Sequence, residues 1–182
     1  MNNKVMDKNV YKIVLIGDSG VGKSSIAYWL LQNRRCLDFS STIGASFLAK
    51  ELCVTIKNND GHEENTIINL HVWDTAGQER FRSIARMYYK NTAGCVCIFD
   101  LTSRESFINL NYWLRDYKEN DYNSTTTIIL IANKSDFPEE NWKVSMKEII
   151  DFANANDCSY FFTNCINGDG IQKAFKLLGK TI

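Results

Sequence analysis

Short apolar runs alternate with amphipathic segments along this chain. The runs have the length of buried strands, and the segments repeat their apolar positions at the spacing of a helix. Because strands and helices alternate over most of the chain, the pattern predicts an α/β fold with a mostly parallel sheet covered on both faces. The predicted strands are 11–16, 47–56, 66–73, 95–101, 127–132 and 160–163, and the predicted helices are 23–32, 104–120, 145–155 and 169–179.

Capping and turn signals mark the ends of these elements. Thr102 and Glu105 have the spacing of a helix capping box, and so do Ser145 and Glu148. The dipeptide Asp60-Gly61 favours a hairpin turn between the second and third strands. We therefore expect these two strands to form an antiparallel hairpin at one edge of the sheet.

The composition indicates one domain of ordinary size. The chain has 182 residues, of which 45% are hydrophobic, enough to bury a core. We expect a single domain over residues 10–180, with an enlarged hairpin tip near 57–65, after a short polar extension at 1–9. The extension carries no apolar signal core, and the apolar runs elsewhere are too short to span a bilayer.

Charge and cysteine content argue against several classes of function. The formal net charge is zero and no basic segment stands out, so we expect no nucleic-acid partner. The six cysteines form no Cys-x-x-Cys pair, and His62 and His71 are the only histidines, which argues against a Cys/His metal site. Scattered thiols of this kind are typical of a protein in the reducing cytosol.

The stretch GDSGVGKSS at 17–25 fits the phosphate-binding pattern G-x-x-x-x-G-K-[ST] between a predicted strand and a predicted helix. Glycines allow successive main-chain N–H groups to curl round phosphates, and the helix N-terminus adds its positive end. Lys23 can reach the β- and γ-phosphates, and the Ser24 hydroxyl can bind Mg²⁺. The alternative is a glycine turn with a surface lysine, which the strand-to-helix context disfavours.

A second motif, WDTAGQERF at 73–81, follows the third predicted strand. Asp74 ends that strand, so its carboxylate can face the Mg²⁺ site, and Gly77 lets the main chain approach a γ-phosphate. Gln78 carries both a donor and an acceptor, which suits the orientation of an attacking water. Asp-Thr-Ala-Gly alone would also fit a simple turn after a strand.

A third motif, Asn133-Lys134-Ser135-Asp136, follows the strand IILIA. A carboxylate at Asp136 can accept two hydrogen bonds from guanine, from the ring N–H and the amino group, whereas adenine offers no such pair. The tetrapeptide alone would usually be a polar turn. Because the other two motifs are also present and the tetrapeptide follows a predicted parallel strand, it favours a guanine site.

Together these residues resemble the Ras-like small GTPases, and specifically the Rab family, over nearly the whole chain from Tyr11 to Gly179. The Rab-like stretches are FSSTIGASF at 39–47, RFRSIARMYYKNTAG at 80–94 and IFDLTS at 98–103. Within them, TIGASF and RSIARMYYK are most similar to the early-endosome subgroup. The resemblance implies a Ras-like P-loop fold, with a mostly parallel six-stranded sheet, about five flanking helices and one antiparallel hairpin edge.

The resemblance also implies roles for particular residues. Thr42 resembles the switch threonine that meets Mg²⁺ and the γ-phosphate, so the implied metal set is Ser24, Thr42 and Asp74, and the implied catalytic set is Gln78, Lys23 and Thr42. Phe47, Trp73 and Tyr88 resemble the aromatic triad that Rab effectors contact. The implied nucleotide-binding set is Asp18, Ser19, Gly20, Val21, Gly22, Lys23, Ser24, Ser25, Thr42, Gly77, Asn133, Lys134, Asp136, Asn164, Cys165 and Ile166.

Two departures from the family pattern fall on the guanine end. Arg35 occupies the position where the family usually has an aromatic residue against the base. The arginine could stack on guanine by a cation–π contact, or leave the base less covered, or Leu37 or Phe39 could move in instead. Asn164-Cys165-Ile166 replaces the family's Ser-Ala-Lys, which removes the side-chain support of the serine and lysine. We therefore hypothesise a looser grip on the base and a faster nucleotide off-rate than in a typical Rab.

Two further departures concern length. The stretch from Phe47 to Trp73 is longer than in typical relatives, and a longer solvated hairpin explains this more simply than an added partner contact. No cysteine follows Cys165, so the prenylated cysteines that usually end a Rab are absent from this sequence. We favour a removed tail over a natural lack of one, and without a tail the chain should not hold to a membrane by itself.

The sequence thus predicts a Rab-like GTP/GDP switch of vesicular, endosomal membrane traffic that slowly hydrolyses GTP with Mg²⁺ as cofactor. We expect a cytoplasmic monomer that reaches vesicle or endosome membranes only through a lipidated tail, and that meets an exchange factor, an activating protein and effectors. No arginine is clearly placed to act in cis, although Arg80 follows Gln78 closely and stays a candidate. The alternatives are a guanine-nucleotide-binding module with little hydrolysis, an ATP-using P-loop enzyme and a scaffold with a vestigial site.

Overall fold

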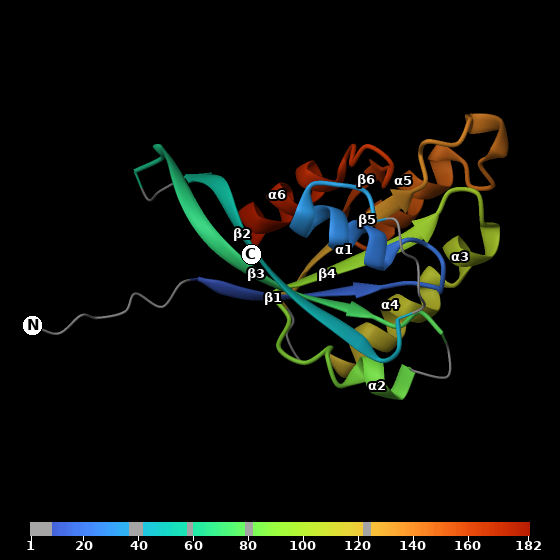
Figure 1. Cartoon of the computed structure of the whole chain (residues 1–182), viewed down its shortest axis with the longest axis horizontal. Helices are drawn as coiled ribbons and strands as arrows, with labels where there is room; N and C mark the ends of the chain where they lie inside the picture. Colours follow the sequence, from blue (N-terminus) through green and yellow to red (C-terminus); the bar gives the residue numbers. More distant parts are fainter. Residues whose placement is uncertain (1–8, 37–41, 58–59, 79–81, 122–124) are drawn as a thin grey trace, which may run out of the picture.

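A six-stranded sheet forms the centre of the computed structural model, which describes residues 9–36, 42–57, 60–78, 82–121 and 125–182. The strand order is β2-β3-β1-β4-β5-β6; β2 and β3 are antiparallel, and all other neighbours are parallel (Figure 1). The expected mostly parallel sheet with one antiparallel edge is confirmed. The strands are β1 (Val10–Ile16), β2 (Ala45–Lys57), β3 (Glu63–Thr75), β4 (Gly94–Asp100), β5 (Thr127–Asn133) and β6 (Ser159–Thr163).

Helices cover both faces of the sheet because its central strands are apolar on both sides. All seven residues of β4 are buried, as its unbroken apolar run predicts. One buried cluster joins the sheet to α1 and α6, and a second joins its other face to α2, α3, α4 and α5. The helices are α1 (Lys23–Gln32), α2 (Arg82–Arg86), α3 (Arg104–Ile108), α4 (Leu110–Asn120), α5 (Met146–Ala155) and α6 (Ile171–Thr181), with a 3₁₀ turn η2 at Glu139–Asn141.

The segment expected as one helix over 104–120 is divided at Asn109. This residue occupies both the C-cap position of α3 and the N-cap position of α4. The predicted capping box of Thr102 and Glu105 is wrong. Ser103 is the N-cap, and its hydroxyl accepts a hydrogen bond from the main-chain N–H of Ser106. Thr102 instead donates to the carboxylate of Asp100, which also accepts from the Thr102 N–H.

The second capping box, formed by Ser145 and Glu148, is confirmed at the start of α5, where each side chain bonds the other residue's main-chain N–H. This box has an additional partner, because Arg104 of α3 forms an ion pair with Glu148 at 2.6 Å. The Arg104 guanidinium and the two Ser145 contacts hold the pKa of Glu148 low, at about 2. The cap therefore joins α5 to α3.

The β2–β3 hairpin is paired along nearly its whole length, from Ala45 opposite Thr75 to Lys57 opposite Glu63. Residues beyond those we expected as strand have joined the ladder, so only 58–62 lie between the two strands. The hairpin extends past α6 in Figure 1, at the upper left of the view. Among the described residues, no helix has the length and apolar character needed to cross a membrane.

A core substitution in α6 tests this packing. Phe175 is fully buried among residues of the sheet, α1 and α6. We expect Phe175→Ala to lower the free energy of unfolding by about 3–5 kcal/mol, because it removes buried apolar surface and leaves a cavity. Urea denaturation measures the change. Lys176→Ala, an exposed neighbour on the same helix, should stay within about 0.5 kcal/mol of the parent, and equal losses in both variants would contradict the assigned packing.

Candidate functional site

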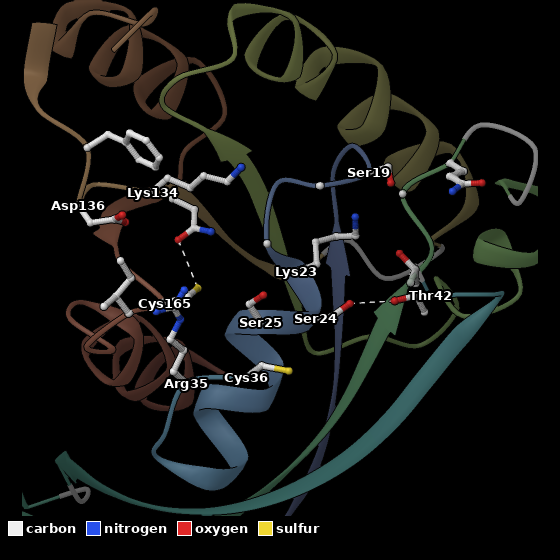
Figure 2. Close-up of a pocket in the computed structure, with 18 residues that line it drawn as sticks. Ser19, Lys23, Ser24, Ser25, Arg35, Cys36, Thr42, Lys134, Asp136 and Cys165 are labelled. Carbon is white, nitrogen blue, oxygen red and sulfur yellow. Dashed lines mark hydrogen bonds between the residues drawn. The ribbon is translucent and has the colours of Figure 1, made fainter. Parts of the chain in front are cut away.

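A cavity of about 570 Å³ lies where β1, β3, β5 and β6 end, and segments from three distant parts of the chain line it (Figure 2). This is the edge at which parallel α/β sheets usually bind ligands. Most of the residues that the sequence singled out are brought together here. They are Ser19, Gly20, Gly22, Lys23, Ser24, Ser25, Thr42, Gly77, Gln78, Asn133, Lys134, Asp136, Cys165 and Ile166.

At one end of the cavity, the loop after β1 wraps round the amino group of Lys23. The Nζ atom donates to the carbonyls of Gly17 and Asp18, at 2.8 and 2.7 Å. Only 5% of the Lys23 surface is exposed. Burial lowers the pKa of Lys23 to about 8, although the negative charges of Asp74 and Asp18 oppose the change. An anionic ligand here would supply the counter-charge that favours the protonated amine.

Gly22, which precedes α1, has a main chain that only glycine fits. Its φ is +101°, a conformation that L side chains rarely adopt. An added Cβ would also overlap the side-chain amide of Asn133. Gly20 likewise has a positive φ, of +79°, but faces open space. A side chain at Gly22 would therefore clash with Asn133, whereas a Cβ at Gly20 would meet no atom within 4 Å.

Three side-chain oxygens meet beside Lys23. Ser24 Oγ donates to Asp74 Oδ2 at 2.5 Å and lies 2.8 Å from Thr42 Oγ1, whose distance to the same Asp74 oxygen is 3.4 Å. The other carboxylate oxygen, Oδ1, is buried with no hydrogen-bond partner among the described residues. Burial raises the pKa of Asp74, and the Ser24, Lys23 and Thr42 contacts work against it. Hard oxygen donors with one unpartnered carboxylate oxygen fit a magnesium ion.

Gly77 and Gln78 reach the same end of the cavity from the segment after β3. Gly77 lies so close to the loop that a Cβ would overlap Lys23 Nζ and the main-chain carbonyl of Asp18. The lack of a side chain at Gly77 therefore permits the approach of this segment to the cavity. Arg80, the expected neighbour of Gln78, lies outside the described residues.

At the opposite end, Asn133 of β5 bonds to two other segments, the loop after β1 and the end of β6. Its Nδ2 donates to the carbonyl of Val21 at 2.8 Å, and its Oδ1 accepts from Thr163 Oγ1 at 2.8 Å. The thiol of Cys165 also lies 3.6 Å from Oδ1. Because Asn133 is only 2% exposed, these contacts satisfy an amide that would otherwise be costly to bury.

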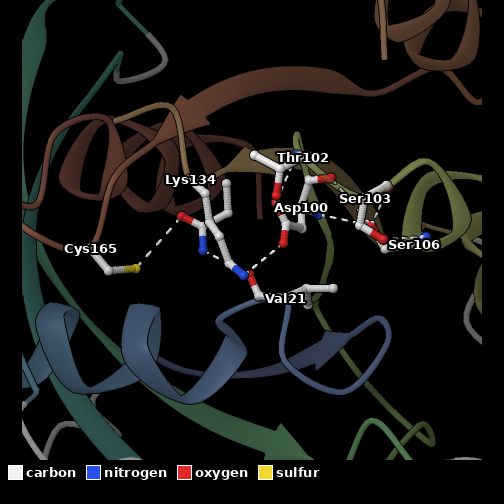
Figure 3. Close-up of polar contacts among 8 residues, drawn as sticks. Val21, Asp100, Thr102, Ser103, Ser106, Lys134 and Cys165 are labelled. Atoms are coloured by element: carbon white, nitrogen blue, oxygen red, sulfur yellow. Dashed lines mark hydrogen bonds and ion pairs between the residues drawn. The ribbon is translucent and has the colours of Figure 1, made fainter. Parts of the chain in front are cut away.

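Lys134 follows Asn133 with a positive φ of 65° and turns its amine to Asp100, at 2.6 Å (Figure 3). Asp136 and Phe137 continue along this wall of the cavity. The Asp136 side chain lines the cavity beside Lys134 in Figure 2. This wall therefore offers a carboxylate acceptor and an apolar ring to a ligand.

The loop after β6 supports itself through Asn164. Its Oδ1 accepts from the N–H groups of Ile166 and Asn167, at 2.7 and 3.3 Å, which is the geometry of an Asx turn. Burial raises the pKa of Cys165 to about 11, so its thiol stays protonated at neutral pH. The side-chain support that we expected to be lost is thus partly replaced by contacts within the loop and by the Cys165–Asn133 contact.

Arg35 lines the same end of the cavity as Asp136 and Cys165 (Figure 2). Its side chain is exposed. The other residues considered for covering the base, Leu37 and Phe39, lie outside the described residues. The sequence reasoning did not single out Phe137 or Cys36, which also line the cavity. Phe137 directly follows the Asn-Lys-Ser-Asp motif, and its apolar character beside polar residues was an available signal.

Three residues of the expected nucleotide-binding set, Asp18, Val21 and Asn164, do not line the cavity. The Asp18 carboxylate accepts from Asn109 Nδ2 at 2.8 Å and from Trp113 Nε1 at 2.6 Å. Val21 is buried and contributes the carbonyl that Asn133 binds. Any contact of Asp18 with a ligand would therefore come from its main chain.

The three expected effector aromatics form one cluster next to the cavity segments. Trp73 stacks on Tyr88 with ring centroids 4.6 Å apart, and Phe47 lies 5.1 Å from Trp73. Phe47 is 49% exposed, whereas Trp73 and Tyr88 are partly covered. Ile43 and Met87 nearby in sequence are 81% and 71% exposed. The structure thus presents apolar side chains from both segments that flank the cavity.

Comparison with known proteins agrees with this geometry. A model of the Ras family matches residues 12–182. A probable Rab-related GTPase of Acanthamoeba polyphaga mimivirus is 46% identical over 176 residues, which are 96% of this chain and 78% of that protein. Ras-related protein Rab-5B of Plasmodium falciparum is 38% identical over 94% of this chain and 77% of its own length. Ras-related protein Rab-27B of Bos taurus is 34% identical, with 92% and 77% covered.

The two loop glycines give a matched test of the cavity wall. Gly20→Ala should lower the free energy of unfolding by about 1 kcal/mol, because only the left-handed main chain resists it. Gly22→Ala should cost about 2 kcal/mol more, because its methyl group also displaces Asn133. Urea denaturation of both variants measures the difference. A Gly22 variant as stable as the Gly20 variant would show that Asn133 does not crowd this loop.

Proposed function

Because the chain belongs to the Ras family of small GTPases and is related within it to the Rab proteins, we propose that it is a GTP/GDP switch of vesicular membrane traffic that hydrolyses GTP. The observation that carries the proposal is the meeting, in one cavity, of Lys23, Ser24, Thr42 and Gln78 at one end with Asn133 and Asp136 at the other. We propose one GTPase domain over residues 10–180.

The loop at 17–24 binds the phosphates in this proposal. The amine of Lys23 is already held toward the cavity by two carbonyls, so little reorganisation is needed when phosphate oxygens arrive. Main-chain N–H groups of the loop and the first turn of α1 add further donors. Ser19, Ser25 and Gly77 complete this end of the cavity.

Ser24, Thr42 and Asp74 would hold Mg²⁺, in agreement with the unpartnered oxygen of Asp74. The ion supplies positive charge against phosphate oxygens when bound. Thr42 also belongs to the segment before β2, so its contact with Ser24 joins that segment to the phosphate end. Loss of the γ-phosphate would weaken this junction, which is the basis of the switch.

Hydrolysis is the in-line attack of water on the γ-phosphorus. A bond forms from the water oxygen to the γ-phosphorus, the bond from that phosphorus to the bridging oxygen breaks, and GDP leaves with the electron pair of the broken bond. One proton of the water stays on the inorganic phosphate that forms, and the other passes to solvent. Gln78 orients the water, since its amide offers both a donor and an acceptor, and Lys23 stabilises charge on the phosphate oxygens. Turnover by the chain alone is slow, so an activating protein accelerates it and an exchange factor releases GDP.

Guanine lies in this proposal at the end of the cavity lined by Asn133, Lys134 and Asp136 together with Cys165 and Ile166. The Asp136 carboxylate accepts from the ring N–H and the amino group of guanine. An adenine ring would present no such pair of donors, which disfavours an ATP-using enzyme. The main-chain N–H of Cys165 donates to the guanine carbonyl.

Effectors bind the aromatic triad of Phe47, Trp73 and Tyr88 in this proposal. Phe47 follows Thr42 along the chain and Tyr88 follows Gln78, so the cluster joins the two segments that would contact the γ-phosphate. The stretches TIGASF and RSIARMYYK, which resemble the early-endosome subgroup, favour an endosomal role on the cytosolic face of the membrane, and stable attachment there would require a lipidated tail. A binding module without hydrolysis would leave Gln78 and Thr42 without a purpose, and a scaffold would leave the buried Lys23 unexplained.

Nucleotide content and turnover test the proposal directly. The chain, purified with Mg²⁺ and then denatured, should release guanine nucleotide and no adenine nucleotide by chromatography, and ATP should not compete with added GTP. In a single-turnover assay, Gln78→Leu should slow GTP hydrolysis about tenfold or more, because the attacking water loses its orientation. GDP affinity should stay unchanged in this variant, since Gln78 acts on the γ-phosphate alone.

The outcomes separate the alternatives. Bound guanine nucleotide with no measurable hydrolysis in wild type would identify a binding module instead of a GTPase. Release of adenine nucleotide would point to the ATP-using enzyme, and an empty chain that ignores GTP would point to the scaffold. Each of these results would overturn the proposed reaction.

Base retention is the second test. We propose that Arg35 covers guanine less well than an aromatic ring and that the nucleotide off-rate is correspondingly fast. Arg35→Phe should slow GDP dissociation roughly tenfold, through stacking on the base. Arg34→Phe is the matched control, because Arg34 is also exposed but does not line the cavity. A fluorescent GDP chase measures both, and an Arg35 variant no slower than wild type would show that the arginine already covers the base.

A further inference from the structure

The carboxylate of Asp18 points away from the cavity although its residue belongs to the phosphate-binding loop. Its two oxygens accept hydrogen bonds from different partners, Oδ2 from Asn109 at 2.8 Å and Oδ1 from Trp113 at 2.6 Å. Hydrogen bonds to an ionised carboxylate are among the stronger ones in proteins. The loop is therefore anchored to the junction of α3 and α4, which lies more than ninety positions away in sequence.

The main chain of the same residue carries two parts of the proposed phosphate site. The Asp18 carbonyl accepts from Lys23 Nζ at 2.7 Å. The carbonyl group also lies against Gly77, where a Cβ would overlap it. The position of one peptide group thus sets both the direction of the Lys23 amine and how closely Gly77 can approach.

This peptide group needs an external support. It lies between Gly17, with a φ of +139°, and a loop that contains Gly20 and Gly22, all with positive φ. Glycine main chains have several accessible conformations, so the loop alone does not determine the position of the carbonyl. By contrast, Trp113 is 1% exposed and packed in the core of the opposite face, which makes it a rigid donor.

The break between α3 and α4 is explained by the same contact. Asn109 is the residue that separates the two helices, and its side chain makes no cap hydrogen bond to the start of α4. The side chain is directed to Asp18 instead. The Asn109 side chain therefore stabilises the loop after β1 and not the start of α4.

We propose that Asn109 and Trp113 are positioning residues that fix the Asp18 carbonyl and thereby hold Lys23 and Gly77 at the γ-phosphate. This inference rests on the proposed function, because it concerns the same reaction. Gly77 meets a ligand only when a γ-phosphate is present, so loosening the anchor weakens GTP binding and slows hydrolysis more than it weakens GDP binding. A support that only stabilised the fold would affect both nucleotides equally.

Two variants and one matched control test the anchor. Trp113→Phe removes the Nε1–H but keeps an aromatic ring in the core, and Asn109→Ala removes the Nδ2 donor. Asn111→Ala is the control, because Asn111 is exposed on α4, and its Nδ2 donates to the main-chain carbonyl of Ile108, outside the phosphate-binding loop. Asn109→Ala also keeps the test possible if the tryptophan variant does not fold.

The measurements are single-turnover GTP hydrolysis and the affinity ratio of a non-hydrolysable GTP analogue to GDP. We expect each anchor variant to lower both the hydrolysis rate and this ratio by roughly tenfold, and the Asn111 control to change neither. In an Asp18→Ala background, Asn109→Ala should have little additional effect, since both substitutions remove the same contact.

Wild type distinguishes the failure of this inference from the failure of the proposed function. A wild-type chain that neither retains nor hydrolyses GTP would overturn both. An active wild type whose anchor variants keep its rate and its affinity ratio would overturn the anchor alone. Anchor variants that melt at a lower temperature with an unchanged ratio would assign Asn109 and Trp113 to stability, and additive losses in the Asp18 background would show that they act elsewhere.

Discussion

The side-chain amide of Asn133 is the contact on which the rest of the site depends. It joins the end of β5 to the carbonyl of Val21 in the phosphate-binding loop and to Thr163 at the end of β6. The two ends of the cavity are therefore not independent, since the loop proposed to bind phosphates is bonded to the strand that leads into the proposed base motif. Gly22 is required beside it because a side chain there would occupy the space of the amide. One buried polar group thus sets the distance between the two ends of the cavity.

The cavity has two different electrostatic environments. At the phosphate end, an almost fully buried ammonium and a buried carboxylate lie near each other, and the proposed ligands supply the charges that they lack. Burial strengthens such interactions, so this end tolerates few substitutions. At the base end, Arg35 is exposed and the loop after β6 is shaped by its own Asn164. Because its own Asn164 stabilises the loop after β6, substitutions in that loop can occur without disturbing Lys23 or Asp74.

The sequence was sufficient for the six strands, for the longer helical segments and for most of the cavity, because these depend on local signals, whereas the five-residue helix α2 was not predicted. Apolar runs specify buried strands such as β4, and the glycine spacing at 17–24 specifies the loop. The two wrong predictions at 102–120, the capping box and the single helix, have one physical cause: a polar side chain can bond to either a local or a distant partner. Thr102 has the spacing of a cap but binds Asp100, and Asn109 interrupts a helical pattern to reach Asp18. No periodicity in the sequence distinguishes these choices.

Helix α4 connects the loop to the segment after β3 through two residues one turn apart. Trp113 donates to Asp18, while Asp116 accepts from Arg86 of α2 through Nε at 2.9 Å and Nη2 at 2.5 Å. Asp116 is 3% exposed, and a buried carboxylate that lost its partner would be costly, so the ion pair favours a docked α2. Tyr88 follows α2 and stacks on Trp73, which places the aromatic cluster next to this ion pair. The helix therefore holds the phosphate-binding loop and the base of the exposed aromatic surface in one frame, so a displacement at either one is resisted by contacts to the same rigid element.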